Sequence, residues 1–219
     1  MRSRYGDVFN HDDEADGYDL EVRNEKDPIR AAYDDVLRWV AQEARVISTS
    51  RVLELGSGTG NLSFLIPACG ELICVDLSGR MEAIARKKSA HLANRRFVRA
   101  DILEVFEHEV GPFNSVISAY TVHHLTDDEK GALFAKIFTS LVPGGRAVFG
   151  DLMVQNGEAK ALKIQEYLAA GDTKTAQDIK EEFFWLINAA VADLSRLGFL
   201  VRTRRFSDLS YGIVAEKVN

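Results

Sequence analysis

The sequence predicts an α/β fold with a mostly parallel sheet of seven strands that ends in an antiparallel hairpin. Three observations support this: short apolar runs alternate with stretches of helical periodicity, the last two runs flank a short loop, and 46% of the 219 residues are hydrophobic. Such alternation is typical of a parallel sheet covered by helices on both faces. The length suits one core, so we expect a single domain over residues 1–219.

Five apolar runs are the predicted parallel strands. They occupy residues 51–55, 71–75, 96–100, 115–119 and 146–150. After the second run, Ser78 can cap a helix whose apolar face includes Met81. After the fourth run, Thr126 and Glu129 have the spacing of a capping box and predict the start of another helix. That helix is expected to end at 143–145, where Pro-Gly-Gly suits a helix exit.

The last quarter of the chain predicts a helix followed by a hairpin. Residues 181–197 carry apolar side chains at helical spacing, and Gly198 follows them. The runs 199–206 and 211–218 are separated by only four residues. We therefore expect these two strands to pair antiparallel at the end of the sheet.

Two segments fall outside the regular alternation. Residues 1–45 are expected to form an N-terminal lid, and about 153–182 a substrate-side insertion, over whatever the protein binds. Phe183, Phe184 and Trp185 follow this insertion. Three consecutive aromatic side chains on a helix cannot all face the core. We expect Phe184 to face the core and Trp185 or Phe183 to face the cleft.

Composition argues against several classes of partner. The formal charge of -6 and the isoelectric point near 5.4 give no positive field for nucleic acid. No signal-peptide pattern or apolar stretch of membrane-spanning length occurs, so we expect a cytoplasmic protein that binds no membrane. Cys69 and Cys74 have no spacing typical of a disulfide framework or a metal site, and we predict no metal.

A glycine-rich motif follows the first predicted strand. Gly56, Gly58 and Gly60 lie where α/β sheets bind nucleotide-like ligands. Glycine lets the backbone turn sharply and approach a ligand closely. The dinucleotide fingerprint is G-x-G-x-x-G, whereas this chain has G-x-G-x-G preceded by Glu54. The motif therefore disfavours NAD.

Two further carboxylates follow the next two predicted strands. Asp76 ends the second strand, where it can accept hydrogen bonds from both hydroxyls of an adenosine ribose. Asp101 ends the third strand, where it can accept a hydrogen bond from the amino group of an adenine, and Ile102 can cover the ring. Three such features at successive strand ends are more specific than the glycine loop alone.

With these motifs, the whole chain resembles the class I S-adenosylmethionine-dependent methyltransferases, whose fold is Rossmann-like and doubly wound. The resemblance lies in residues 54–60 (ELGSGTG), Asp76, Asp101, 117–120 and 141–146. Within this class the chain is similar to the YrrT-like bacterial methyltransferases, through residues 15–19 (ADGYD) and 120–127 (YTVHHLTD).

The resemblance implies S-adenosylmethionine as the cofactor and a small molecule as the methyl acceptor. The cofactor-binding residues that we expect from it are Tyr18, Glu54, Gly56, Ser57, Gly58, Asp76, Leu77, Met81, Asp101, Ile102 and Ala119. Tyr18 also has a rationale of its own, because an aromatic face attracts a sulfonium cation. The alternative for Tyr18 is that it only packs the lid onto the sheet.

Methyl transfer from a sulfonium needs alignment more than acid–base chemistry. If the acceptor must lose a proton, the nearby candidates are His123 and His124. We expect His124 to be catalytic, and Tyr120, His123 and Trp185 to contact the substrate.

Two other functions remain open from the sequence. One is a protein that binds S-adenosylmethionine as a sensor or store without transferring the methyl group. The other is a nicotinamide-dependent oxidoreductase, which the glycine spacing and the missing Ser/Tyr/Lys constellation disfavour.

Overall fold

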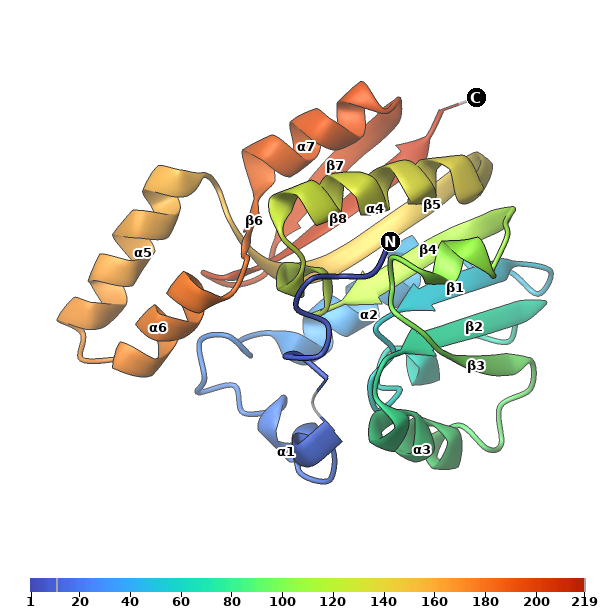
Figure 1. Ribbon diagram of the computed structural model, residues 1–219, viewed down its shortest axis with the longest axis horizontal. Coiled ribbons are helices and arrows are strands. Elements are labelled where there is room, and N and C mark those ends of the chain that lie inside the picture. Colours follow the sequence, from blue (N-terminus) through green and yellow to red (C-terminus); the bar gives the residue numbers. More distant parts are fainter. Residues whose placement is uncertain (11, 219) are drawn as a thin grey trace.

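The computed structural model describes residues 1–10 and 12–218 (Figure 1). Within these residues, seven strands of an eight-stranded sheet follow the order β3-β2-β1-β4-β5-β8-β7, and the eighth pairs with β5 off this path. These strands are β1 (Arg51–Leu55), β2 (Glu71–Asp76), β3 (Arg95–Arg99), β4 (Phe113–Ala119), β5 (Leu141–Val154), β7 (Phe199–Arg205) and β8 (Ser210–Lys217). The first five pair parallel, whereas β8 pairs antiparallel with both β5 and β7. The predicted fold class is therefore confirmed.

Helices cover the sheet and extend beyond it. They are α1 (Tyr18–Glu21), α2 (Tyr33–Glu43), α3 (Gly79–Lys88), α4 (Asp127–Ser140), α5 (Gly157–Ala169), α6 (Thr173–Glu181) and α7 (Ile187–Arg196). Four single turns of 3-10 helix add η1 (Asp12–Glu14), η2 (Ser63–Leu65), η3 (Val105–Glu107) and η4 (Val122–His124). Within the described residues, no helix has both the length and the apolar character needed to cross a membrane.

The hydrophobic core has two parts, one on each face of the sheet. Leu53 and Leu55 of β1 pack with α4 and α7 on one face. Val52, the residue before Leu53, packs with α2 and with Leu62 and Ile66, which flank η2, on the other. This change of face along β1 follows from the period of two of a strand. Because β1 is buried on both faces, the consecutive residues Val52 and Leu53 are both apolar although they face opposite sides of the sheet.

The expected helix over 181–197 is wrong in its first third. Helix α7 begins only at Ile187, and Trp185–Leu186 form a short strand, β6, that pairs parallel with the end of β5. The Trp185 ring is fully buried against Phe134 and Phe149, with ring centroids 5.4 and 5.2 Å away. Tertiary packing of this ring therefore overrides the helical periodicity of the sequence.

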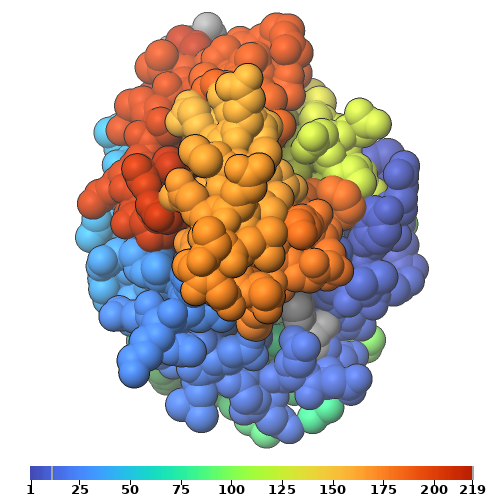
Figure 2. Space-filling model, turned by 90° about the vertical axis from the view of Figure 1, so that its left-hand side faces the viewer, coloured from blue at the N-terminus to red at the C-terminus, as the bar shows by residue number. Residues whose placement is uncertain are grey.

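The two irregular segments meet at one end of the sheet. Residues 157–181 form the antiparallel pair α5 and α6, which projects beyond the sheet (Figure 1). Figure 2 shows α5 and α6 beside the N-terminal segment on the same face of the molecule. An ion pair joins them, because Lys174 Nζ of α6 lies 3.4 Å from Asp27 Oδ2.

Candidate functional site

A cavity of about 300 Å³ lies beside the carboxyl ends of β1, β2 and β4. Its walls come from three parts of the chain: the N-terminal segment between Phe9 and Leu37, the turns that follow these strands, and α6 with Glu182 directly after it. The volume is that of a small-molecule site. In α/β sheets, the carboxyl ends of the strands are also where ligands bind.

The glycine motif forms one wall of this cavity. Gly56 and Gly58 have positive φ values of 70° and 51°. A Cβ atom at Gly58 would meet nothing within 4 Å, so its backbone faces open space. Between them, Ser57 is 6% exposed, and its buried Oγ has no hydrogen-bond partner among the described residues. The loop therefore offers both room and an unused polar atom to a ligand.

Glu54 lies behind this loop at the end of β1 and is only 1% exposed. Burial raises the pKa of its carboxyl group to about 7, although hydrogen bonds with Ser63 and Cys74 act in the opposite direction. Glu54 also lines the cavity. A positively charged ligand group beside it would favour the ionised carboxylate again.

Asp76 joins the glycine loop to the start of α3. Its Oδ2 accepts a hydrogen bond of 2.7 Å from the backbone N–H of Gly58, and its Oδ1 accepts one of 2.9 Å from Ser78. Met81 and Ala119 line the cavity together with Asp76. The structure therefore brings these sequence-predicted residues together with Glu54 and the glycine loop.

Three of the expected cofactor residues do not line the cavity: Leu77, Asp101 and Ile102. Residues of the N-terminal segment cover Leu77 and Asp101, and Ile102 packs in the hydrophobic core. The backbone N–H and the hydroxyl of Ser3 both donate to Asp101 Oδ2. A Cβ atom at Gly6 would lie 3.0 Å from Leu77 and 3.1 Å from Asp101. No motif or periodicity in residues 1–10 predicts that this segment reaches the end of the third strand.

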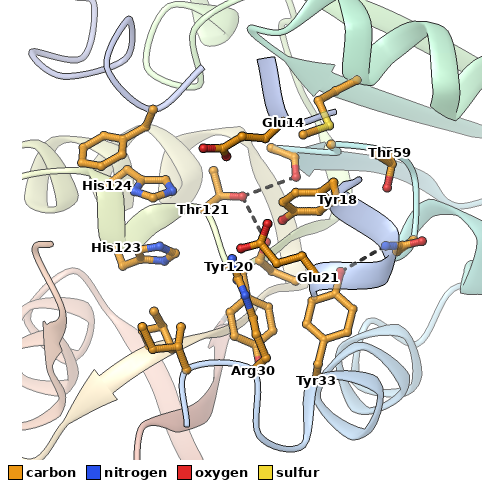
Figure 3. A pocket seen from close by; sticks show the side chains of 18 of the residues that line it. Glu14, Tyr18, Glu21, Arg30, Tyr33, Thr59, Tyr120, Thr121, His123 and His124 are labelled. Atoms are coloured by element: carbon orange, nitrogen blue, oxygen red, sulfur yellow. Dashed lines mark hydrogen bonds between the residues drawn. The ribbon is translucent and has the colours of Figure 1, made fainter. Parts of the chain in front are cut away.

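Tyrosine rings form the side of the cavity opposite the histidines (Figure 3). Tyr33 stacks on Tyr120 with ring centroids 5.1 Å apart, and Tyr18 lies nearby. Burial raises the pKa of all three phenols above the ordinary value of 10. These hydroxyls are therefore neutral donors and acceptors rather than bases.

The two adjacent histidines have different surroundings. The ring of His124 stacks on Phe9 with centroids 4.1 Å apart. His123 is 3% exposed, and its Nδ1 lies 2.5 Å from Asp151 Oδ1. Its Nε2 lies 3.6 Å from Glu182 Oε2. Both histidines line the cavity, together with Glu182.

Three residues in or next to the cavity were not predicted from the sequence: Asp151, Glu182 and Arg30. Asp151 could have been predicted, because it directly follows the fifth predicted strand as Asp76 follows the second. Glu182 and Arg30 lie in irregular segments, where no periodicity places a side chain. Arg30 also lines the cavity, and Figure 3 draws it to the left of Tyr33.

Trp185 does not face the cavity, contrary to the expectation that it contacts substrate. It is fully buried in the core and is absent from the cavity walls. Phe184 is buried as expected, and Phe183 packs against Tyr5 with ring centroids 5.2 Å apart.

The fold and this cavity define a Rossmann-like α/β protein with a ligand site at the strand ends. Residues 52–145 match the family described as the methyltransferase domain. The chain is 30% identical to an uncharacterized methyltransferase of Oceanobacillus iheyensis, over 100% of both chains. It is 27% identical to the uncharacterized methyltransferase YrrT of Halobacillus halophilus, over 99% of both chains. The chain therefore belongs to the methyltransferase family, and the predicted resemblance is confirmed.

Solved structures show the same fold at low sequence identity. Magnesium protoporphyrin IX methyltransferase from Synechocystis, with bound SAH, superposes with a TM-score of 0.67 at 20% identity, covering 97% of each chain. Phosphoethanolamine N-methyltransferase 2 of Haemonchus contortus, in complex with S-adenosyl-L-methionine, gives a TM-score of 0.71 at 17% identity. That alignment covers 98% of this chain and 59% of the other.

Proposed function

We propose that this methyltransferase transfers the methyl group of S-adenosylmethionine to a small-molecule acceptor by direct displacement and releases S-adenosylhomocysteine. The observation that carries the proposal is the open glycine loop beside two cavity-lining carboxyl groups, Glu54 and Asp76. The buried, unpartnered Oγ of Ser57 in the same loop supports it.

The residues around the loop suit the parts of this cofactor. Gly56, Ser57 and Gly58 would hold its methionine part, with Glu54 close to the positive charge. Asp76 would accept hydrogen bonds from the ribose hydroxyls, each contributing about 1.5–3 kcal/mol to a charged acceptor. When bound, the cofactor supplies an activated methyl group, so the protein chiefly aligns the reactants.

The adenine is assigned to Leu77, Asp101 and Ile102, with Met81 and Ala119 lining the neighbouring wall. This assignment requires residues 3–6 to move, because they now cover Leu77 and Asp101. The N-terminal segment, residues 1–45, would thus act as a lid. Residues 153–182 would form the acceptor side, opposite the cofactor.

The charges of the cavity support a cationic cofactor. Among the described lining residues, seven carry carboxyl groups, two carry permanently cationic groups (Arg30 and Lys174), and two are histidines. The acids are Glu14, Glu21, Asp27, Glu54, Asp76, Asp178 and Glu182. S-adenosylmethionine carries a sulfonium and an ammonium against one carboxylate, so an acidic wall attracts it. The enclosed volume and the acidic chain favour a small acceptor over a nucleic acid.

Titration calorimetry with S-adenosylmethionine, S-adenosylhomocysteine and NAD tests the cofactor. We expect binding of both sulfur nucleosides and none of NAD. Asp76→Ala should weaken that binding by about tenfold or more. Asp193→Ala is the matched control, because Asp193 lies on α7 outside the cavity walls. Equal affinity of the two variants would remove Asp76 from the site, and absence of binding to the wild type would refute the proposed function. Binding without transfer of a labelled methyl group to any small metabolite would instead favour a sensor.

A further inference from the structure

His123 is held in one orientation by Asp151, at the end of β5. Asp151 Oδ2 accepts hydrogen bonds from the backbone N–H groups of Val122 and His123, 2.9 and 3.2 Å long. Its Oδ1 accepts one from the Leu152 N–H at 2.8 Å and contacts His123 Nδ1 at 2.5 Å. Because a carboxylate accepts hydrogen bonds, the Nδ1 proton points at Asp151. In the neutral ring, Nε2 then carries the lone pair.

A second hydrogen-bond acceptor, the carboxyl group of Glu182, lies beside the lone pair on His123 Nε2. Glu182 Oε2 lies 3.6 Å from Nε2, too far for a hydrogen bond between them. Glu182 Oε2 is buried and has no hydrogen-bond partner among the described residues. Both side chains line the cavity. The pair therefore presents two neighbouring acceptors to a ligand that can donate twice.

Other charged groups surround this pair on the packed elements. Lys130 of α4 donates to the carbonyl oxygen of Phe183 at 2.6 Å, and burial lowers the pKa of its ammonium group. The positive charge of Arg30 lowers the pKa of Glu182, and the negative charge of Asp178 raises it. Burial is the largest influence on Glu182 and raises its pKa, whereas His123 lowers it. A cationic ligand group between Glu182 and His123 would hold Glu182 in its ionised form.

We infer that Asp151 and His123 form the proton-accepting pair of the methyl transfer, and that the acceptor is an amine that enters as an ammonium ion. This inference rests on the proposed function. His123 is the catalytic residue, because its Nε2 faces the acceptor. Asp151 is a positioning residue that acts through His123.

Glu182 Oε2 and His123 Nε2 together determine which chemical class of methyl acceptor fits the site. A primary ammonium can donate one hydrogen bond to Glu182 and one to His123 at the same time. A hydroxyl or a thiol has one proton and satisfies only one of them, which leaves a buried acceptor without a partner. The tyrosine rings on the other side of the cavity can also pack against a cationic or aromatic amine.

The reaction balances with these groups alone. The ammonium nitrogen gives one proton to His123 Nε2, and the freed lone pair forms a bond to the methyl carbon. The carbon–sulfur bond breaks, and its electron pair stays on sulfur, which becomes a neutral thioether. The product leaves as a methylammonium ion, and His123 returns the proton to solvent.

Histidine-selective ¹⁵N NMR on the complex with S-adenosylhomocysteine tests the pair. His123→Gln assigns the signals. We expect wild-type His123 to be protonated at Nδ1 and not at Nε2 near neutral pH, and Asp151→Asn to abolish that preference. Phenethylamine should move the Nε2 signal further than phenethyl alcohol does. Protonation of Nε2 in the free site would overturn the inference, and so would an equal response to the two probes or a response to neither.

Methyl transfer to phenethylamine supplies a second readout. His123→Gln should lower kcat by about 10²–10⁴-fold. Asp151→Asn should lower kcat with little change in KM. The matched control is His91→Gln, because His91 is exposed and lies outside the cavity. Wild-type protein that fails to bind S-adenosylhomocysteine refutes the proposed function. Binding with unchanged kcat in His123→Gln refutes only the inference about the pair.

Discussion

The ammonium group of Lys88 lies 2.7 Å from Asp19 Oδ2 and so joins α3 to helix α1 of the N-terminal segment. Thr59 and Asn61 donate to the other oxygen of Asp19, at 2.6 and 3.0 Å. Burial by itself raises the pKa of Asp19, but these hydrogen bonds and Lys88 outweigh it and hold the pKa below the ordinary 3.8. The proposed lid is thus attached beside the glycine loop.

Loss of this attachment should loosen the lid. Lys88→Met removes one partly exposed ion pair of about 1 kcal/mol or less, so we expect S-adenosylhomocysteine to dissociate up to about fivefold faster in stopped-flow measurements. Lys87→Met is the control, because Lys87 is exposed on the same helix. Because the pKa of Asp19 is lowered, its contribution to lid attachment is complete above pH 3.8. It is lost as the pH falls below 3.8 and through the lowered pKa. Equal rates in both variants would contradict this role.

Two glycines of the same loop should respond differently to alanine. A Cβ at Gly56 would lie 2.1 Å from the Thr121 hydroxyl oxygen, whereas one at Gly58 meets nothing within 4 Å. Both have positive φ, so each change costs about 1–2 kcal/mol of backbone strain. Gly56→Ala adds an overlap of about 1–3 kcal/mol. Urea unfolding should therefore rank Gly56→Ala as the less stable protein.

Cofactor affinity provides the complementary readout for this pair. Gly58→Ala should fold but bind S-adenosylhomocysteine more weakly, because its methyl group fills space in the cavity wall. Undiminished affinity of Gly58→Ala would show that the ligand does not approach this backbone.

Glu54 should make the ligand-free protein less stable as the pH rises. Its pKa is raised from 4.5 to about 7 by burial. The folded state therefore favours the protonated acid, and this contribution is complete below 4.5 and lost as the pH rises through 7. By about pH 8 the loss amounts to roughly 3 kcal/mol. Urea unfolding at about pH 5 and 8 should show it in the wild type and not in Glu54→Gln. Parallel pH dependence in the two proteins would place the ionised carboxylate in a better solvated site.

Trp185 should contribute to stability and not to binding. Because its ring is fully buried against Phe134 and Phe149, Trp185→Ala should cost about 3–5 kcal/mol in unfolding free energy. Trp185→Phe should cost less. The folded fraction of either variant should bind S-adenosylhomocysteine as the wild type does, as measured by calorimetry. Unchanged stability with weakened ligand binding would place the ring in the site after all.

The parallel strands and the cofactor-side loop were predictable because their signals are local. Strands such as β1 are buried on both faces, so they read as short apolar runs, and the glycine spacing lies within a single turn. Asp76 was placed correctly beside the loop because the end of a parallel strand fixes where its next side chain lies.

The rest depends on contacts between distant parts of the chain. Trp185 was assigned to the cleft because its neighbours suggested a helix, whereas pairing with the end of β5 turns its ring into the core. Leu77 and Asp101 lie at the expected strand ends, but no pattern in residues 3–6 indicates that this segment covers them. Arg30 likewise lies in a segment whose position is set only by tertiary packing.

The cavity walls come from two parts of the fold: the sheet with its turns, and the segments outside the sheet. The two parts differ in how freely their residues can be substituted. The sheet and its turns bear the residues proposed to bind the cofactor, so a substitution there disturbs the hydrophobic core beneath them. The proposed acceptor side is bordered by Arg30, Lys174 and Glu182, which lie outside the sheet, in the N-terminal segment, in α6 and directly after α6. If the proposed function holds, mutations in these segments can alter the set of accepted compounds while the strands and turns of the sheet stay unchanged. Homologues can therefore diverge in the compound that they methylate faster than in the methyl donor that they use.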